Sequence, residues 1–123
     1  MEEFIEIAKK AQENAYVPYS NFKVGAVLIT KEGKIYTGCN VENHGIMSIC
    51  AERVAFTKAI SEGERNFTKI LVIGDKDYTT PCGYCRQFMS EFVNKEFEIY
   101  TVYNGNKTKK YLIEELLPQS FNL

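Results

Sequence analysis

The chain has 123 residues, of which 45% are hydrophobic and 25% charged, with a formal net charge of −1. This composition predicts one globular domain over residues 1–123, and its balance of charge lacks the basic face that nucleic-acid binding needs. No apolar run approaches the roughly 20 residues of a membrane span, and the acidic start of the chain is unlike a signal peptide, so we expect a cytoplasmic protein that acts on a small molecule.

The first half of the chain predicts a helix, a hairpin and a second helix. The stripe Phe4, Ile7, Ala8, Ala11 and Ala15 predicts a helix over residues 2–15, which the residues before Pro18 end. A β-branched run predicts a strand at 22–30 that returns at 35–41 after a turn. After a loop at 43–48, a helix is expected from residue 49 or 50 to about 61, with the stripe Val54, Ala55, Ala59 and Ile60.

The second half predicts a strand at 69–74, a helix at 82–93, strands at 97–103 and 108–112, and a helical turn at 113–117. The three-residue turn between the last two strands is too short for a parallel crossover, so these strands are expected to be antiparallel neighbours. We therefore predict an α/β fold, a three-layer α/β/α sandwich with one mixed five-stranded sheet.

Three of the four cysteines lie in two motifs, Cys50-Ala51-Glu52-Arg53 and Pro81-Cys82-Gly83-Tyr84-Cys85. Each motif opens a predicted helix, where the partial positive charge favours thiolate over thiol. Three thiolates can bind Zn²⁺ and leave its fourth position for water. Zinc lowers the pKa of such a water to about 7, and Glu52 could take its proton. The two motifs therefore indicate a hydrolytic zinc site.

Two other uses of the cysteines remain open from spacing alone. Cys82 and Cys85 could form a redox pair. A structural zinc site would need a fourth ligand, and only Cys39 or His44 could supply it; otherwise Cys39 is expected to be a small buried residue and His44 a polar loop residue. Glu52 favours the catalytic use, because neither alternative gives it a task.

The negative charge of three thiolates calls for a positive partner. Arg53 and Arg86 each follow a cysteine motif, and a guanidinium that donates to the sulfurs would restore the acidity of the metal. The spacing alone does not show which of the two arginines has this role.

The two motifs, with the second extended through Arg86-Gln87, resemble the zinc motifs of the cytidine deaminases in their small three-cysteine form. Residues 16–26, 38–43 and 114–121 resemble other segments of that family. The resemblance implies that Cys50, Cys82 and Cys85 bind zinc and that Glu52 shuttles protons. It also implies that Arg53 pairs with the thiolates, and that the substrate is bound by Phe22, Asn40, Glu42, Ala51 and Phe121.

The resemblance implies hydrolytic deamination of cytidine and 2′-deoxycytidine in pyrimidine salvage. It also implies a homotetramer in which Phe121 reaches a neighbouring subunit's site. The chain departs from the family between Glu42 and Cys50, where it has seven residues without a tyrosine instead of the usual eight. This departure concerns the sugar pocket and the subunit contacts, not the zinc chemistry.

The shortened loop keeps alternative functions open. Blasticidin S deaminases also have a short loop here, so blasticidin S or a modified cytidine is an alternative substrate, but those enzymes lack the ribose-binding glutamate that Glu42 represents. A polynucleotide deaminase would need a basic channel and a helix between the last two strands. A non-catalytic zinc-binding assembly module would have no use for Glu52.

Overall fold

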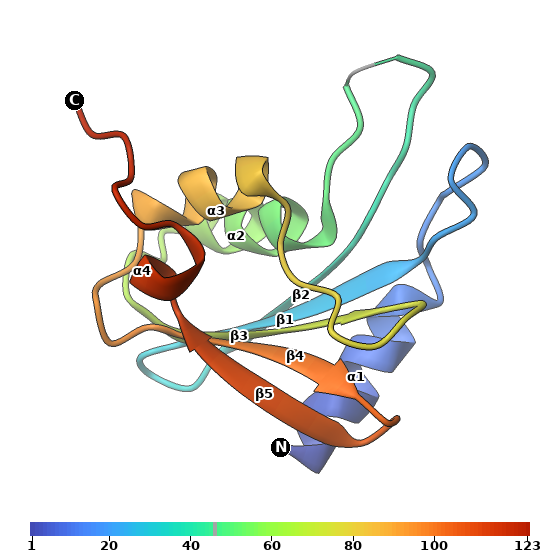
Figure 1. The fold of residues 1–123 in the computed structure, drawn as a ribbon, viewed down its shortest axis with the longest axis horizontal. Coiled ribbons are helices and arrows are strands. Elements are labelled where there is room, and N and C mark those ends of the chain that lie inside the picture. The colour runs from blue at the N-terminus through green and yellow to red at the C-terminus, as the bar shows by residue number, and fades with distance from the viewer. Residues whose placement is uncertain (46) are drawn as a thin grey trace.

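A computed structural model describes residues 1–45 and 47–123, and its sheet carries helices on both faces (Figure 1). The elements in chain order are α1 (Glu2–Gln12), β1 (Val24–Thr30), β2 (Ile35–Cys39), α2 (Ala51–Ser61), β3 (Phe67–Gly74), α3 (Gly83–Ser90), β4 (Glu98–Tyr103), β5 (Lys107–Leu112) and α4 (Ile113–Leu116). The strand order is β2-β1-β3-β4-β5, with β3 and β4 parallel and the other neighbours antiparallel. The predicted fold class is therefore confirmed.

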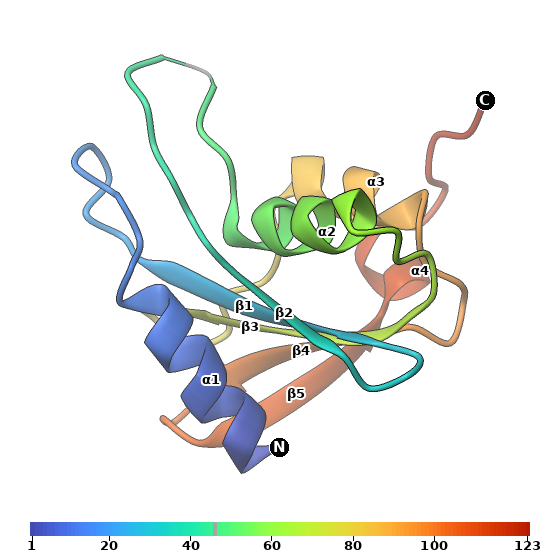
Figure 2. The ribbon, with the colours of Figure 1, turned by 180° about the vertical axis from the view of Figure 1, so that it is seen from behind.

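The helices divide unequally between the two faces of the sheet. Helix α1 covers one face, whereas α2, α3 and α4 lie on the other (Figures 1 and 2). Helix α3 provides the crossover that parallel pairing of β3 and β4 requires. No helix within the described residues is both long enough and apolar enough to span a membrane.

Several predicted helix ends were wrong. Helix α1 ends at Gln12 rather than residue 15, because the amides of Asn14 and Ala15 bond to carbonyls only three residues back. Helix α3 ends at Ser90 rather than residue 93 for the same kind of reason. The predicted face of α1 omitted Ile5, which is buried with Ala8, while Phe4 and Ile7 of the predicted stripe pack against the same core. The predicted loop at 43–48 contains Ile46, which lies outside the described residues.

The face that carries α2 and α3 has an aromatic core centred on Phe56, which the predicted stripe of α2 omitted. Phe56 is fully buried. Its ring lies 5.1 to 6.4 Å, centroid to centroid, from the rings of Phe67, Phe88, Phe92 and Phe97. Burying one such side chain stabilises the fold by roughly 1.5–3 kcal/mol. This core fixes α2 and α3 against the sheet and against each other.

The first turn of α2 lies unusually close to β2. A Cβ atom added at Gly38 would clash with the carbonyl oxygen of Ala51 and lie 2.8 Å from the amide nitrogen of Ala55. Only glycine permits this approach, since any side chain would push the helix away from the strand. Gly38 thereby sets the depth at which Cys50 and Glu52 lie.

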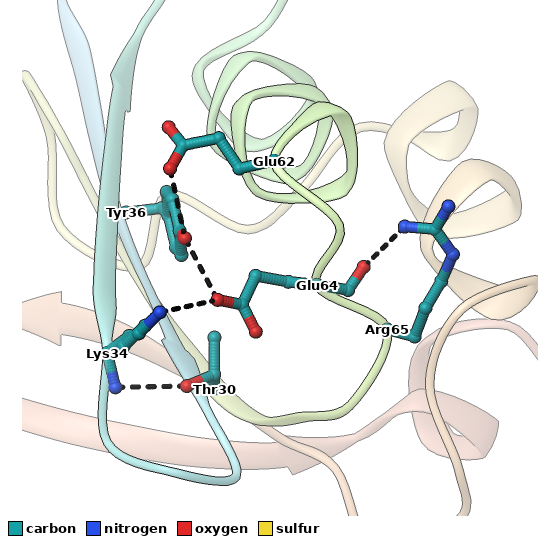
Figure 3. A network of polar contacts seen from close by, with 6 residues as sticks. All are labelled: Thr30, Lys34, Tyr36, Glu62, Glu64 and Arg65. Carbon is teal, nitrogen blue, oxygen red and sulfur yellow. Dashed lines mark hydrogen bonds and ion pairs between the residues drawn. The ribbon is translucent and has the colours of Figure 1, made fainter.

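The opposite end of α2 is tied to β2 by a polar network (Figure 3). The hydroxyl of Tyr36 donates to Glu64 at 3.0 Å and lies 3.5 Å from a carboxylate oxygen of Glu62, while the Lys34 ammonium lies 3.4 Å from Glu64. Partial removal from water and these carboxylates raise the pKa of Tyr36 to about 12. The network lies at the far end of α2 from Cys50, so its role is to hold the helix in place.

Candidate active site

Three cysteine sulfurs meet where α2 and α3 begin. Cys50 and Cys82 are the N-cap residues of these two helices, and Cys85 lies one turn into α3. The Sγ atom of Cys82 lies 3.7 Å from that of Cys50 and 3.6 Å from that of Cys85, and all three lie within 4.8 Å of one another. Sulfurs bound at about 2.3 Å to one tetrahedral zinc ion lie about 3.8 Å apart. The cluster fits Zn²⁺.

The sheet topology explains why two helix starts converge here. Helix α2 precedes β3 and runs back along it, whereas α3 follows the loop that leaves the end of β3. Both helices therefore begin beside the carboxyl ends of the parallel strands β3 and β4. Ligand sites of α/β proteins lie outside this edge of the sheet.

The candidate ligand set consists of three side chains. Within residues 1–45 and 47–123, neither of the possible fourth ligands, Cys39 and His44, joins the cluster. Cys39 is half-buried, rather than buried as predicted, and His44 is exposed. A zinc ion held by three protein ligands keeps a position for water or substrate, as in catalytic sites.

Glu52 is a carboxyl group buried beside these sulfurs. Its side chain belongs to the first turn of α2, and the residue is only 4% exposed. Burial, with a smaller effect from neighbouring Cys50, raises the pKa of Glu52 to about 7. A group with this pKa can both accept and release a proton near neutral pH, as a general acid–base catalyst must.

The structure separates the roles of the two arginines. Nη2 of Arg53 lies 3.6 Å from Sγ of Cys50, and its guanidinium carbon lies 4.2 Å from the centroid of the Tyr84 ring. Hydrogen bonds from Cys85, and then from Arg53, lower the pKa of Cys50 to about 5. Within the described residues, Nε of Arg53 is buried without an acceptor. This N–H group therefore remains available to a further acceptor.

Arg86 instead joins the start of α3 to the C-terminal segment. Its guanidinium donates to the carbonyl oxygens of Pro81, at 2.6 Å, and Leu116, at 2.9 Å, and to Oγ1 of Thr80. The neighbouring Gln87 donates to the carbonyl oxygen of Phe121 at 2.9 Å. These contacts hold Pro81, the residue before Cys82, in place. Sequence reasoning missed them because no local spacing rule relates Arg86 to residue 116.

A hollow of about 490 Å³ lies beside the segment that precedes Cys50 in the chain. Glu42 lines it, together with Tyr19, Ser20, Asn43, His44, Gly45 and Ser48. One carboxylate oxygen of Glu42 accepts from the amides of Tyr19 and Ser20, at 3.0 and 3.1 Å. Hydrogen bonds from Ser20 lower the pKa of Glu42, so this carboxylate is ionised at neutral pH. A second hollow, of about 600 Å³, lies beyond the C-terminal end of α3, and no cysteine lines it within the part of the chain that the structure describes.

Asn40 connects the site to the start of β1. Its Oδ1 accepts from the amide of Val24 and its Nδ2 donates to the carbonyl oxygen of Phe22, both at 2.9 Å. Gly38 faces α2. Since alternate residues of a strand share a face, Asn40 lies on the same side as α2.

Comparison of the chain with known proteins shows which family it belongs to. The sequence profile described as the cytidine and deoxycytidylate deaminase zinc-binding region matches residues 1–101. The chain belongs to the cytidine and deoxycytidylate deaminase family. It is 44% identical to a cytidine deaminase of Sporosarcina psychrophila, over 99% of this chain and 91% of that protein. It is 47% identical to a probable cytidine deaminase of Dictyostelium discoideum, over 99% and 84%.

A solved structure resembles this deaminase chain closely. The crystal structure of cytidine deaminase from Burkholderia pseudomallei superposes with a TM-score of 0.90, at 42% identity, over 97% of each chain. Identity at this level over nearly the whole length extends the family relation beyond the zinc motifs.

Not all the residues predicted for a deaminase site lie together in this chain. The structure brings Cys50, Cys82, Cys85, Glu52 and Arg53 into one cluster. Ala51 is fully buried between two of them. Phe121, by contrast, is 68% exposed in the C-terminal segment beside α3.

The cysteine cluster predicts tightly bound zinc. We expect metal analysis of the purified protein to find one zinc ion per chain. Cys85→Ser should weaken zinc affinity, measured by competition with a chromogenic chelator, by more than the roughly 10–100-fold that loss of a supporting group causes. Cys39→Ser is the matched control and should retain zinc. A metal-free protein with a Cys82–Cys85 disulfide would contradict the zinc assignment and favour the redox alternative.

Proposed function

We propose that the chain catalyses hydrolytic deamination of cytidine and 2′-deoxycytidine to uridine and 2′-deoxyuridine, with release of ammonia. The observation that carries this proposal is the buried carboxyl of Glu52, with a pKa of about 7, beside three sulfurs spaced for one zinc ion. The relatives named as cytidine deaminases, at 44% and 47% identity, support the same activity.

In this mechanism, Cys50, Cys82 and Cys85 would hold the metal. Bound zinc supplies a water with a pKa near 7, the nucleophile that hydrolysis at neutral pH requires. Glu52 would accept one proton from the attacking water and deliver it to the ring nitrogen. It would then accept the second proton, from the hydroxyl group that has added to the base, and deliver it to the amine as the carbon–nitrogen bond breaks and ammonia leaves. Because each proton taken up is released again, the carboxyl returns to its starting state after each turnover.

Arg53 offsets the negative charge of the three thiolates. Its hydrogen bond to Cys50 withdraws electron density from the sulfur, and its stack on Tyr84 holds the guanidinium in place. Ala51 lies between Cys50 and Glu52, where its backbone would face the base.

Phe22, Asn40 and Glu42 would bind the substrate. Phe22 packs against the pyrimidine, and Asn40 and Glu42 hydrogen-bond the ribose hydroxyls. The hollow beside Glu42 includes no lysine or arginine among the described residues, and its one carboxylate is ionised. This charge favours an uncharged sugar over a nucleotide phosphate, so we propose a nucleoside substrate. Glu42 also favours cytidine over blasticidin S or a modified cytidine, which remain the alternatives within the class.

We further propose a homotetramer whose sites are completed by Phe121 of a neighbouring subunit. Large apolar side chains are exposed in two regions: Tyr16, Tyr19, Val41, Met47 and Ile49 in the loops near β1 and β2, and Phe121 in the C-terminal segment. Association would remove them from water. We also propose that residues 1–123 act as one catalytic domain, in pyrimidine salvage in the cytoplasm, where a reducing environment preserves the free thiols.

Glu52→Gln tests the mechanism directly. The amide cannot carry protons, so we expect turnover of cytidine to fall by a factor of about 10² to 10⁴. Turnover is followed by the loss of cytidine absorbance, and zinc content is measured on the same sample to show that the metal is retained. Glu62→Gln, at the exposed end of the same helix, is the control. Near wild-type turnover in Glu52→Gln would rule out this mechanism.

A substrate panel tests the pocket. We expect cytidine and 2′-deoxycytidine to have the highest kcat/KM, with cytosine, blasticidin S and deoxycytidylate at least about tenfold lower, a difference of 1.4 kcal/mol. Glu42→Gln should lower kcat/KM for the nucleosides and narrow the gap to deoxycytidylate, because it removes the repulsion of phosphate. A preference for blasticidin S would support the alternative substrate. Full zinc occupancy without turnover of any cytosine nucleoside would instead favour a non-catalytic zinc module.

Complementation between variants tests the quaternary proposal. Phe121→Ala should lower kcat/KM by about tenfold at unchanged zinc content, since it truncates a contact that the proposed tetramer would bury. Mixed tetramers of Phe121→Ala and Glu52→Gln chains should regain activity, because some sites then combine an intact Glu52 with an intact Phe121 from the neighbour. Light scattering coupled to gel filtration measures the mass. A monomeric active enzyme, or mixtures without recovered activity, would contradict the shared site.

A further inference from the structure

The segment Phe22-Lys23-Val24 has a hydrogen-bond partner for each polar backbone atom on its three residues, and most partners are side chains. Asn40 binds the carbonyl oxygen of Phe22 and the amide of Val24. The amide of Phe22 donates to Oγ of Ser20 at 3.1 Å, and the carbonyl oxygen of Val24 accepts from the amide of Asn40 at 3.3 Å. The two remaining atoms belong to Lys23.

Lys23 is held by a pair of side chains, Gln12 and Asp75, which we call the Lys23 clamp. Oδ2 of Asp75 accepts from the amide of Lys23 at 2.7 Å, and Nε2 of Gln12 donates to the Lys23 carbonyl oxygen at 2.9 Å. Nε2 of Gln12 also lies 3.2 Å from Oδ1 of Asp75. The three groups form a closed triangle, and its shortest bond is charge-assisted and therefore the strongest.

The fold brings the clamp together from distant parts of the chain. Gln12 is the last residue of α1, and a Cβ at Gly25 would lie 2.9 Å from its amide nitrogen, so glycine lets the end of α1 rest on β1. Asp75 directly follows β3, whose last residue, Gly74, pairs with Val24. Both members therefore reach Lys23 at the edge of the sheet beside which α2 and α3 begin.

The clamp and Asn40 hold the same backbone from different sides. Val24 packs into the core on the α2 side of the sheet. Continuing the alternation of β1 back by two residues would place Phe22 on that side and Lys23 on the α1 side. Phe22 precedes the first residue of β1, so its position depends on these side-chain bonds rather than on the sheet ladder.

We propose that Gln12 and Asp75 are positioning residues that act through Lys23 to hold Phe22 and Asn40 in the orientation that binds a pyrimidine nucleoside. The proposal rests on the function proposed above. Neither residue touches substrate; they restrain the backbone between two groups that do. Loss of the clamp lets Phe22 and Asn40 sample other orientations, which weakens substrate binding more than it slows the proton transfers of Glu52.

The chain offers a matched control in the same loop. Oδ1 of Asp77 accepts from the amide of Asn104 at 3.1 Å, so Asp77 is also an exposed aspartate bound to a backbone amide. Its contact lies at the β4–β5 turn rather than beside Phe22. Asp75→Ala and Asp77→Ala remove similar interactions, and only Asp75→Ala affects the clamp.

Steady-state kinetics with cytidine separate the two variants. We expect Asp75→Ala to raise KM about tenfold with kcat changed less than about threefold, and Asp77→Ala to stay within about twofold of wild type. Asp75→Asn keeps an oxygen that can accept from the Lys23 amide, so its KM should lie between those of wild type and Asp75→Ala. Amide exchange adds a readout that is independent of activity: the Lys23 amide should exchange faster in Asp75→Ala, while zinc content and exchange in α2 stay unchanged.

The opposing outcomes are distinct. Three results with an active wild type would overturn the clamp and leave the proposed function standing. These are an unchanged KM in Asp75→Ala, an equal rise in KM in Asp75→Ala and Asp77→Ala, and a fall in kcat alone. A lower zinc content in Asp75→Ala would show a general structural role and would also overturn it. A zinc-loaded wild type that deaminates no cytosine nucleoside would overturn the proposed function itself.

Discussion

The first turn of α2 rests directly on β2 at Gly38, where a side chain would collide with the backbone of Ala51 and Ala55. This contact draws Cys50 and Glu52 toward the sheet and removes Glu52 from water, which raises the pKa of Glu52 to about 7. The aromatic core around Phe56 and the network of Tyr36 secure the remainder of the helix. The acid–base property of one carboxyl thus depends on the packing of a whole helix.

Electrostatics at the cluster follow a single pattern, in which positive groups surround the place where negative charge gathers. Two helix N-termini point at the sulfurs, and Arg53 donates to Cys50. Arg86 contributes differently, because it uses its donors to secure the backbone before Cys82. The two arginines lie in or next to similar motifs in the chain. Arg53 offsets negative charge on the sulfurs, whereas Arg86 holds the backbone before Cys82 in place.

The residues predictable from sequence were those whose chemistry is local. Cysteines one helical turn apart and a glutamate two residues after Cys50 indicate a zinc hydrolase, and period-2 and period-3.6 patterns indicated the order of the strands and helices. Helix ends were less predictable, since the same apolar residues also suit the tightened turns after Gln12 and Ser90. The Lys23 clamp had no local signal: its members lie 11 and 52 residues from Lys23, and only the sheet register brings them together.

The spacing of the sulfurs along the chain has a thermodynamic consequence. Cys50 and Cys82 are 32 positions apart in sequence, yet their sulfurs lie 3.7 Å apart in the fold. Closing a flexible loop of that length costs about 3 kcal/mol of chain entropy. Folding of the sheet and its helices meets this cost. The scaffold therefore provides a chelate effect: the folded chain binds zinc as a preorganised tridentate ligand, whereas the unfolded chain offers separate thiols.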